Sequence, residues 1–353
     1  MRQQHNRPWG DFLNAGVGGF YRPHDHGVDP LIAFATKLAL AAAGALERRL
    51  SVVLFHRVVT QPDPLLIYEP DPRRFAEQLA WLQASFHILP LPEALERLYN
   101  GTLPAGALAI SFDDGYRDNI LNALPVLQHY DLPATFFVTS GYLNGGMMWN
   151  DRVVEALRYW PTSALDLTRH GLGVHHLGSG RALVMEQLLQ AMKYRAYPER
   201  DAIADELYTR SGAPPMRMMM DAQEIRRLRA AGMTIGGHTA NHPILHAMSR
   251  AGAEREIAEN KTTLEAILGE QLELFAYPNG KPFRDFDGRE IEILRDSGYR
   301  YALTTSDGTA DRHTPAFQIP RFTPWDLRRE RYLARMLLNY FRRPQRVPES
   351  AAA

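Results

Sequence analysis

Residues 107–115 read Ala-Leu-Ala-Ile-Ser-Phe-Asp-Asp-Gly. The first six form a nearly continuous apolar run, which is typical of a strand buried on both faces of a parallel sheet. Asp113 and Asp114 follow at the carboxyl end of this strand, where α/β barrels hold their active sites. Two neighbouring carboxylates repel each other, so they either share a cation or perform two separate tasks. The structural alternative is a solvated turn in which an aspartate caps the next helix.

Similar apolar runs alternate with helical patterns on both sides of this stretch. Further strands are predicted at residues 51–55, 134–138, 233–237, 272–277 and 301–304. Helical patterns cover residues 72–86, 92–98, 117–129, 221–231, 250–268 and 289–296. Strands that alternate with long helices indicate parallel βαβ units, and six or more such units favour a closed or nearly closed barrel.

We expect three parts along the chain. Residues 1–50 are predicted to form a loose leader with an N-terminal helix, and residues 51–326 the barrel. The barrel carries a helical insertion at about residues 150–217, in which no apolar run is long enough to found a sheet of its own. Residues 327–353 are predicted to form a C-terminal helix and a tail.

The composition excludes several classes of protein. The 353 residues include 40 Lys and Arg and 40 Asp and Glu, so the formal net charge is zero. This balance argues against a nucleic-acid-binding protein and against a polybasic membrane-surface protein, because both normally carry a basic excess. The absence of cysteine excludes a disulfide scaffold, a zinc ribbon and a thiol nucleophile.

No segment is predicted to cross a membrane. The most apolar stretch, residues 31–46, contains Lys37 and is shorter than the roughly 20 apolar residues of a membrane span. Polar and glycine-rich residues precede it, so the pattern of a secretory signal is also missing. We therefore expect a cytoplasmic rather than a periplasmic location, and the sequence leaves the oligomeric state open.

A second polar cluster, Gly-His-Thr-Ala-Asn-His-Pro at residues 237–243, follows another predicted strand. His238 and His242 are four residues apart, so on a helical turn both imidazoles can face one metal ion. Pro243 prevents a regular helix from continuing, which predicts a loop or a single turn. Two histidines and one carboxylate leave coordination positions open for water and substrate, as in a hydrolytic metal site. Among 13 histidines, such a pair also arises by chance.

A third cluster, Phe-Ala-Tyr-Pro-Asn-Gly at residues 275–280, follows the next strand. An aromatic residue, proline, asparagine and glycine in this order predict a rigid turn. Such a turn can direct backbone N–H groups at a developing oxyanion. By itself the stretch is far better explained as an ordinary turn.

In this order the three clusters resemble the motifs of the polysaccharide deacetylase family, the NodB-homology or carbohydrate esterase family 4 enzymes. The resemblance is carried by Ser-Phe-Asp-Asp-Gly at 111–115, His-Thr-Ala-Asn-His at 238–242 and Tyr-Pro-Asn-Gly at 277–280. Phe-His-Arg-Val at 55–58 and Pro-Ala-Thr-Phe-Phe-Val at 133–138 are similar too, so it covers most of the chain. The resemblance implies an irregular (β/α) barrel of about seven strands. It also implies an enzyme that removes N-acetyl or O-acetyl groups from a glycan substrate with a divalent metal.

The roles of the family's site residues transfer to the matching positions. The resemblance implies that Asp113 is the general base and that Asp114, His238 and His242 bind the metal. It also implies that the backbone N–H of Tyr277 helps to hold the tetrahedral oxyanion, with Asn279 beside the substrate in the same turn. Zinc is expected from the ligand types, with cobalt or nickel as replacements.

The sequence departs from the family pattern in two places. The third motif begins with Phe275 where many members have an arginine that orients the base. Arg321 is predicted to supply this guanidinium, because a carboxylate needs a fixed bidentate partner; the alternative is a surface ion pair. The catalytic acid histidine also lacks a clear counterpart. We expect His56, at the end of the first strand, rather than His313; the alternative for His56 is a hydrogen-bonded core histidine.

Trp149 stands at the start of the predicted insertion. Its ring could stack on a sugar, although a tryptophan that begins a helical insertion more often anchors it to the barrel. The methionines at 216 and 218–220 are interpreted as packing residues rather than as a cofactor site.

The predicted function is metal-dependent deacetylation of a glycan, and two alternatives stay open. The same residues could hydrolyse a small non-sugar amide, with only the pocket loops differing. The chain could also be a catalytically silent glycan-binding barrel, which the missing motif arginine favours. The intact carboxylate and histidine pairs argue against a silent module, because a pure binder has no use for an open metal site.

Overall fold

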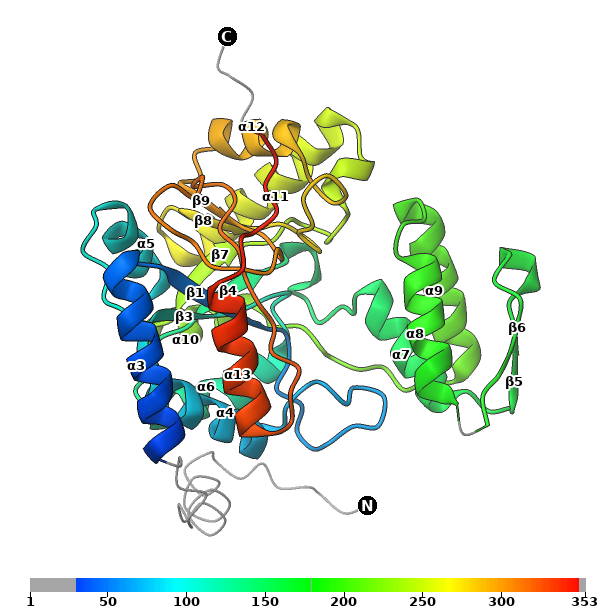
Figure 1. The fold of residues 1–353 in the computed structure, drawn as a ribbon. Coiled ribbons are helices and arrows are strands. Elements are labelled where there is room, and N and C mark those ends of the chain that lie inside the picture. Colours follow the sequence, from blue (N-terminus) through cyan, green and yellow to red (C-terminus); the bar gives the residue numbers. More distant parts are fainter. Residues whose placement is uncertain (1–29, 179, 349–353) are drawn as a thin grey trace.

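The computed structural model describes residues 30–178 and 180–348, so residues 1–29 of the predicted leader and the last residues of the tail lie outside the described part of the chain (Figure 1). Strands and helices alternate along most of it. The strands are β1 (Leu50–Phe55), β2 (His87–Ile88), β3 (Ala107–Phe112), β4 (Thr135–Val138), β5 (Ala164–Asp166), β6 (Val174–His176), β7 (Thr234–Gly237), β8 (Leu274–Ala276) and β9 (Tyr301–Leu303).

The helices that connect the strands agree closely with the predicted ones. The α-helices are α3 (Pro30–Leu46), α4 (Pro72–Ser85), α5 (Leu91–Tyr99), α6 (Leu124–His129), α7 (Trp149–Tyr159), α8 (Arg181–Met192), α9 (Tyr197–Ser211), α10 (Ala222–Ala230), α11 (Arg250–Leu268), α12 (Gly288–Asp296) and α13 (Arg329–Tyr340). Helix boundaries follow local signals: the side chain of Asp71 caps α4, and Ser249 caps α11, which ends at Gly269 in a left-handed conformation.

Seven strands form one curved parallel sheet in the order β1-β3-β4-β7-β8-β9, with β2 paired to β3. β2 pairs with the first two residues of β3 and β4 with the last two, so these two strands share one edge of β3. The expected irregular (β/α) barrel of about seven strands is thereby confirmed. The carboxyl ends of all these strands point the same way, which brings the predicted site clusters to one end of the sheet.

The gap between the outermost strands, β1 and β9, is bridged by an extended segment around residues 319–322. Ile319 pairs with Leu303 of β9, and Phe322 pairs with Val53 of β1. Backbone hydrogen bonds accompany both pairings. The segment therefore closes the sheet into a barrel and places Arg321 between the first and the last strand.

A ladder of phenylalanine rings packs one face of the sheet. Phe55, Phe112 and Phe136 are register partners on β1, β3 and β4. Their rings stack in sequence, with centroids 5.4 Å apart for Phe55 and Phe112 and 4.8 Å for Phe112 and Phe136. Phe75 of α4 meets Phe55 edge-on at 5.2 Å. Stacked rings on paired positions favour this strand order and register, because a shift by one residue would move them to the other face.

One expectation for secondary structure is wrong. The insertion does contain a small sheet, in which β5 and β6 pair antiparallel over three residues each; strands this short show no periodicity in the sequence. The helix expected at residues 117–129 is present, although Asn119–Ala123 within it are π-helical. Pro125 contributes to this local change, since it lacks the N–H that would continue the α-helical hydrogen bonds. The pattern also missed β2, which has only two residues.

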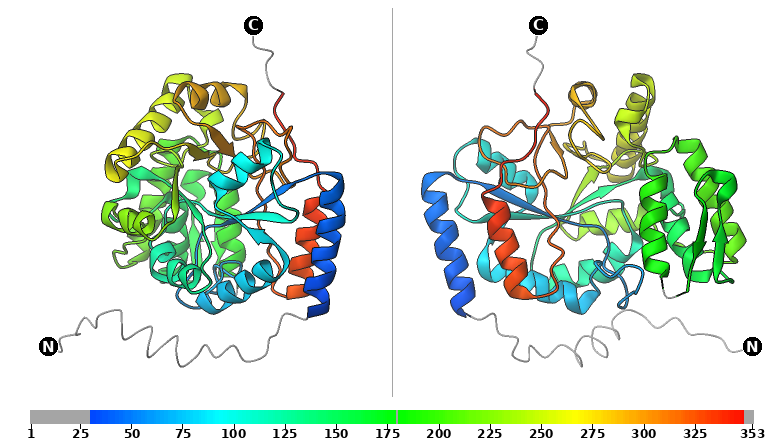
Figure 2. Two further views of the ribbon diagram at one scale, coloured as in Figure 1. Left: turned by 90° about the vertical axis from the view of Figure 1, so that its left-hand side faces the viewer. Right: turned by 45° about the vertical axis from the view of Figure 1, so that its right-hand side comes forward.

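The insertion packs beside the barrel as a compact helical unit of α7, α8 and α9 (Figure 1). Its apolar side chains form a hydrophobic cluster of their own, in which Val153, Leu188 and Leu207 are fully buried. On another side of the barrel, α3 and α13 lie next to each other on the outside of the molecule (Figure 2). Within the described residues, no helix is long and apolar enough to cross a membrane.

The phenylalanine ladder predicts a strong effect of Phe136→Ala on stability. The ring is fully buried and stacked, so its removal leaves a cavity between two strands. We expect the free energy of unfolding to fall by about 3–5 kcal/mol in chemical denaturation. The matched variant Phe341→Ala removes a ring that is 62% exposed and should change it by less than about 0.5 kcal/mol. Equal losses in both variants would contradict the role of the ladder.

Candidate metal centre and active site

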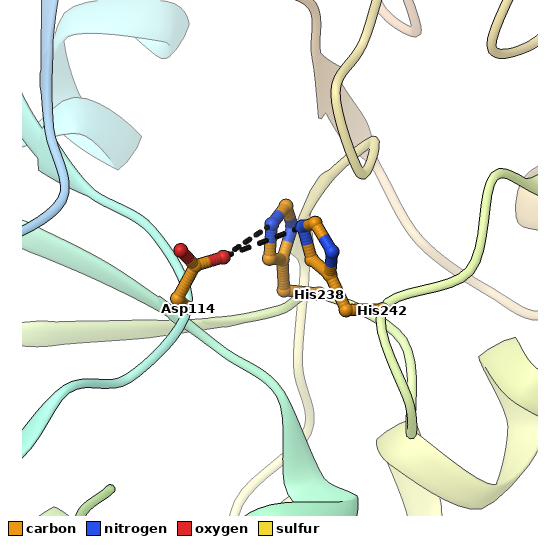
Figure 3. Close-up of side chains that lie close together, drawn as sticks. All are labelled: Asp114, His238 and His242. Carbon is orange, nitrogen blue, oxygen red and sulfur yellow. Dashed lines mark ion pairs between the residues drawn. The ribbon is translucent and has the colours of Figure 1, made fainter. Parts of the chain in front are cut away.

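Three side chains of the metal-ligand type converge at the carboxyl end of the sheet (Figure 3). Asp114 follows β3, and His238 and His242 follow β7. Nε2 of His238 lies 3.4 Å and Nε2 of His242 lies 3.3 Å from the same oxygen, Oδ1 of Asp114. The three candidate ligand atoms are within 4.8 Å of one another. The fold thus brings together the carboxylate and the imidazoles that the sequence predicted as ligands.

The oxygen at the centre of this group is unsatisfied. Oδ1 of Asp114 is buried, and it has no hydrogen-bond partner among the described residues, although two imidazoles face it. A buried ionised oxygen without a partner is unfavourable, so this position attracts a cation. Two imidazole nitrogens and one carboxylate oxygen form a donor set that binds zinc and leaves positions open for water and substrate. The residues present therefore fit a divalent metal ion.

Local electrostatics favours the protonation states that bind a metal. Burial acts to raise the pKa of Asp114, but the imidazoles of His242 and His238 hold that pKa well below its ordinary value. Burial lowers the pKa of His242 to about 4, against the opposing pull of Asp114. At neutral pH Asp114 is thus ionised and His242 is neutral, which are the forms in which these groups act as ligands.

The orientation of His238 is set by a contact on the far side of its ring. Its Nδ1 donates to the backbone carbonyl of Ala276 on β8 at 2.7 Å. This hydrogen bond fixes the tautomer that leaves Nε2 free to accept a metal. Burial acts to lower the pKa of His238, but the carboxylates of Asp113 and Asp114 raise it above its ordinary value. Two carboxylates therefore draw positive charge to this point.

Asn260 of α11 holds the loop that carries the histidines. Its Oδ1 accepts from the backbone N–H of His238 at 3.1 Å. Its Nδ2 donates to the carbonyls of Val138 at 2.9 Å and Thr239 at 2.7 Å. Gly237 makes room for this amide, because a Cβ there would lie 2.7 Å from Asn260 Oδ1. The sequence analysis missed Asn260, although a signal existed: it occupies the apolar face of a helix, in line with the buried residues Ala253, Ile257 and Leu264.

Asp113 stands beside the metal-ligand group and is held by Arg321. Nη1 and Nη2 of the guanidinium donate to Oδ1 and Oδ2 at 2.6 and 2.8 Å, so the pair is bidentate. Arg321 is 1% exposed, which excludes the alternative of a surface ion pair. Its Nε donates to the carbonyl of Thr304 at 3.2 Å. Burial acts to raise the pKa of Asp113, but the charge and hydrogen bonds of Arg321, together with the imidazole of His238, outweigh it and lower that pKa.

The structure corrects the predicted role of the Tyr277 backbone. Its N–H donates to the carbonyl of Leu303 at 3.1 Å, as part of the pairing between β8 and β9. Its side chain is fully buried, stacks on Phe286 and donates to the carbonyl of Phe317. The N–H of Tyr277 is therefore not available to an oxyanion. Two residues later the chain has left the sheet, and the N–H of Asn279 has no acceptor among the described residues.

His56 lies directly after β1 and is half-buried. Its imidazole forms no hydrogen bond with a described residue, so the alternative of a hydrogen-bonded core histidine is wrong. Burial acts to raise the pKa of Asp113 and of Asp114, and the positive charge of His56 is among the groups that lower both. His313, by contrast, is exposed and lies three residues beyond Ala310, which pairs with the first residue of β1 at the opposite end of the sheet.

Trp149 begins α7 and is only 8% exposed. Its ring belongs to the hydrophobic cluster of the insertion, and the guanidinium of Arg200 lies 4.7 Å above it. A ring packed in this way is not presented to a sugar, so stacking on the substrate is wrong for Trp149. It anchors the helices of the insertion to one another.

A buried polar network that the sequence analysis did not predict ties the insertion to the site. Tyr116, one residue after the Asp-Asp-Gly motif, donates to Asp151 of α7 at 3.0 Å. Arg57 lies over the Tyr116 ring at 4.6 Å and bonds to Asp118 at 2.8 Å. Burial raises the pKa of Asp151 to about 7, against the charge of Arg57. Asp151 carried no sequence signal, because its role depends on where the insertion packs.

A second group of ligand-type side chains is explained without a metal. His246, Asp287 and Glu290 lie within reach of a common point. Their carboxylates are already used, since Asp287 accepts from the backbone of Arg289 and Glu290 accepts from the backbone of Asp287. These are the reciprocal hydrogen bonds of a capping box at the start of α12. The group therefore differs from Asp114, whose inner oxygen lacks a partner.

Comparison with known proteins adds the family context. A family model described as polysaccharide deacetylase matches residues 100–302, which is more than half of the chain. The putative polysaccharide deacetylase YxkH of Bacillus subtilis is 19% identical over 251 residues, covering 70% of this chain and 63% of that protein. The poly-beta-1,6-N-acetyl-D-glucosamine N-deacetylase of Staphylococcus epidermidis is 27% identical over 117 residues, covering 32% and 40%. The chain thus spans less than two thirds of the length of these relatives.

Solved structures support the fold. The Streptococcus pyogenes deacetylase PplD in complex with acetate superposes with a TM-score of 0.52 at 19% identity, covering 78% of this chain and 92% of that chain. The BpsB deacetylase domain from Bordetella bronchiseptica superposes with a TM-score of 0.50 at 14% identity, covering 78% and 95%. At such identities the likeness establishes a shared architecture.

The contacts of Asn260 predict that Asn260→Leu damages both the fold and the metal centre. The substitution keeps the side-chain volume but removes three hydrogen bonds, from the buried N–H of His238 and to the carbonyls of Val138 and Thr239, of which Thr239 keeps a bond from the N–H of Ser140. Each such loss costs about 1–3 kcal/mol, so the free energy of unfolding should fall by about 3 kcal/mol or more. Zinc affinity, measured by competition with a chromophoric chelator, should fall about 10- to 100-fold. Asn100→Leu, at an exposed asparagine, is the control and should change neither stability nor zinc affinity. An unchanged zinc affinity in Asn260→Leu would show that the Asn260 amide does not position the histidines.

The raised pKa of Asp151 predicts a specific pH dependence of stability. Between about pH 4 and pH 7 the folded chain keeps a proton on Asp151 that the unfolded chain, with its ordinary pKa of 3.8, has released. This group therefore makes the free energy of unfolding fall as the pH rises through that range. In metal-free protein, Asp151→Asn should gain stability relative to the wild type from pH 4 to pH 7. A difference that stays constant with pH would show that Asp151 does not titrate in this range. The variant Asp131→Asn, at an exposed aspartate, controls for the substitution itself.

Proposed function

We propose that this chain, which belongs to the polysaccharide deacetylase family, is a metal-dependent hydrolase that removes acetyl groups from amino sugars of a glycan. One observation carries the proposal: the unpartnered Oδ1 of Asp114 lies between two imidazole nitrogens, beside a second carboxylate that a buried arginine holds in place. A purely structural cluster would satisfy its buried oxygen, whereas this one leaves it open toward a cation.

Asp114, His238 and His242 are the residues that would hold the metal. When bound there, a divalent cation, for which zinc is our choice from the ligand types, lowers the pKa of water and polarises a substrate carbonyl. The chain's own contribution is to present one ionised oxygen and two imidazole nitrogens to a common point, each fixed by the loop that carries it. Asn260 and Ala276 orient the His238 part of this set.

Asp113 is proposed as the proton acceptor. It is ionised at neutral pH because Arg321 lowers its pKa, and its two oxygens are fixed by the bidentate contact. A carboxylate held in this way accepts the proton of a water molecule that attacks the acetyl carbon. The arginine that the third motif lacks at Phe275 is thus supplied by Arg321, from the segment that closes the barrel.

Asn279 and His56 are proposed to complete the reaction. The free N–H of Asn279 is the donor in the turn after β8 that can stabilise the oxyanion of the tetrahedral intermediate. His56 can donate a proton to the amine nitrogen as the C–N bond breaks, so that acetate and a free amino sugar leave. Among the two histidines considered for this task, only His56 stands at the end of the sheet that carries the carboxylates.

The observed contacts bear differently on the two alternative functions. A silent glycan-binding barrel was favoured mainly by the missing motif arginine, and the contact between Arg321 and Asp113 removes that support. A small non-sugar amide would use the same residues and is decided by assay. We propose N-acetylglucosamine oligomers as the first substrate to test, because several relatives are poly-beta-1,6-N-acetyl-D-glucosamine N-deacetylases.

These roles predict that a variant of the base loses turnover but keeps the metal, whereas a variant of a metal ligand loses the metal. Acetate release from N-acetylglucosamine oligomers should be abolished by a chelator and restored by zinc. Asp113→Asn should keep its metal content but lose about 10²- to 10⁴-fold in kcat. His242→Ala, in the partly exposed ligand, should lose the metal itself.

Metal content is measured by elemental analysis, and the exposed variant Asp131→Asn serves as the control for an aspartate-to-asparagine change. Full activity of Asp113→Asn would refute the base assignment. Release of amine from small amides but not from the oligomers would place the site in the alternative class of amidohydrolases.

A further inference from the structure

The end of the chain concentrates positive charge that the overall composition conceals. Residues 325–346 contain seven arginines and two acidic residues, a net charge of +5, although the whole chain has a net charge of zero. The remaining residues therefore carry a net charge of −5. The neutrality that argues against a polybasic membrane-surface protein is an average over two oppositely charged parts.

Most of these arginines belong to α13 or flank it, and the helix is amphipathic. Its inner side packs on the protein through Tyr332, Leu333, Met336 and Tyr340, which are fully buried. Its outer side lies on the outside of the molecule next to α3, as all views show (Figures 1 and 2). We call the outer side, together with the tryptophan that precedes the helix, the α13 surface; its residues are Trp325, Arg331, Arg335, Leu338, Phe341 and Arg342.

The α13 surface combines apolar side chains in solvent with basic ones. Leu338 is 68% exposed and Phe341 62%. A groove of about 400 Å³ runs beside Leu338; three arginines, Arg331, Arg335 and Arg342, and one carboxylate, Asp326, line it. Within the described part of the chain, Arg335 pairs with Asp326 and Arg342 with Asp307, whereas Arg331 has no acidic partner. The groove thus offers an anion site with an apolar wall.

Aromatic side chains extend this surface at the start of the helix. Trp325 is 53% exposed and meets the exposed Tyr68 edge-on, with ring centroids 5.6 Å apart. Exposed tryptophan and tyrosine side chains favour the boundary between water and lipid, where an apolar ring and a polar tip are both satisfied. Tyr68 belongs to the loop that leaves β1 at His56, so the α13 surface is continuous with a loop of the site.

We infer that the α13 surface binds the face of an anionic phospholipid bilayer. The groove arginines contact lipid phosphates, and Trp325, Leu338 and Phe341 enter the headgroup region. A surface that combines basic, aromatic and leucine side chains binds a membrane through the apolar area that it buries and through attraction to anionic lipid. The inference concerns attachment and is independent of the catalytic activity proposed above.

Two other occupants fit this surface less well. A protein that wraps around a basic amphipathic helix needs its apolar side, but that side of α13 is buried in the protein's own core. A second copy of this chain would bring two arginine-rich surfaces together, and like charges at an interface oppose association. A lipid bilayer requires only one side of the helix and supplies the opposite charge.

The inference is tested by sedimentation of the full chain with vesicles. Phosphatidylcholine vesicles that contain phosphatidylglycerol should bind the protein, vesicles of phosphatidylcholine alone should not, and high salt should weaken binding. Arg331→Gln/Arg342→Gln, in two arginines of the groove, should bind about 30-fold more weakly, the loss expected for two basic side chains near an anionic surface. Leu338→Ser/Phe341→Ser should bind at least about tenfold more weakly, because less apolar area is buried.

Matched controls separate this surface from general charge and stickiness. Arg227→Gln/Arg255→Gln removes two exposed arginines from α10 and α11, and Leu183→Ser/Val174→Ser removes two exposed apolar side chains from the insertion. Both controls should bind like the wild type. Absent binding to anionic vesicles, or equal losses in variants and controls, would overturn the inference. So would analytical ultracentrifugation showing a dimer that Leu338→Ser/Phe341→Ser dissociates without any change in vesicle binding.

Discussion

The buried ion pair between Asp113 and Arg321 joins the closure of the barrel to the orientation of the site. Arg321 lies on the segment that bridges β1 and β9, and its side chain is fully buried there. Removing the partner of a buried charge lowers folding stability by about 3–5 kcal/mol. The segment can therefore follow this path only because the carboxylate of Asp113 lies at the end of β3. Conversely, the arginine fixes both oxygens of Asp113. The same contact therefore completes the fold and aims the carboxylate.

Strained backbone is concentrated in the loops around this pair. Of the six described non-glycine residues with positive φ, four lie in the site loops: Asp114, Thr239, His242 and Asn279. Each such conformation costs about 1–3 kcal/mol and persists only where surrounding contacts enforce it. For the histidine loop these contacts come from α11, where Asn260 bonds to the loop and Glu256 binds Asn241 through two hydrogen bonds. The helix behind β7 thus stabilises a conformation that two imidazoles need to face one oxygen.

The site, the insertion and the basic surface of α13 are built on different elements of the molecule. The carboxyl ends of β3, β7 and β8 hold the reactive groups, and the insertion stands beside them with its own hydrophobic cluster, linked through Tyr116 and Asp151. The arginine-rich surface of α13 lies outside the barrel, where it packs next to α3. Because these parts are built on different elements, their charges do not cancel locally, although they cancel in the composition.

The sequence by itself determined the class of fold and the chemistry of the metal-ligand group. Continuous apolar strands alternating with helices specify a parallel barrel, and Asp114, His238 and His242 follow strands whose carboxyl ends must meet at one edge. Short-range patterns also located most helices, because caps and periodicity are local properties. They failed at β2, β5 and β6, where two or three residues are too few to show a period.

Only the tertiary structure decided which groups act on one another across long separations. It showed that the N–H of Tyr277 donates to Leu303 in the strand pairing, whereas the N–H of Asn279, two residues later, has no acceptor among the described residues. Trp149 is buried inside the insertion, and Arg321 bonds to Asp113, which is 208 positions away in the chain. Asp151 and Asn260 also contact residues that surround the site. Hydrogen-bond satisfaction and burial depend on the packing of elements that are distant in the chain, so no local pattern of residues can specify them.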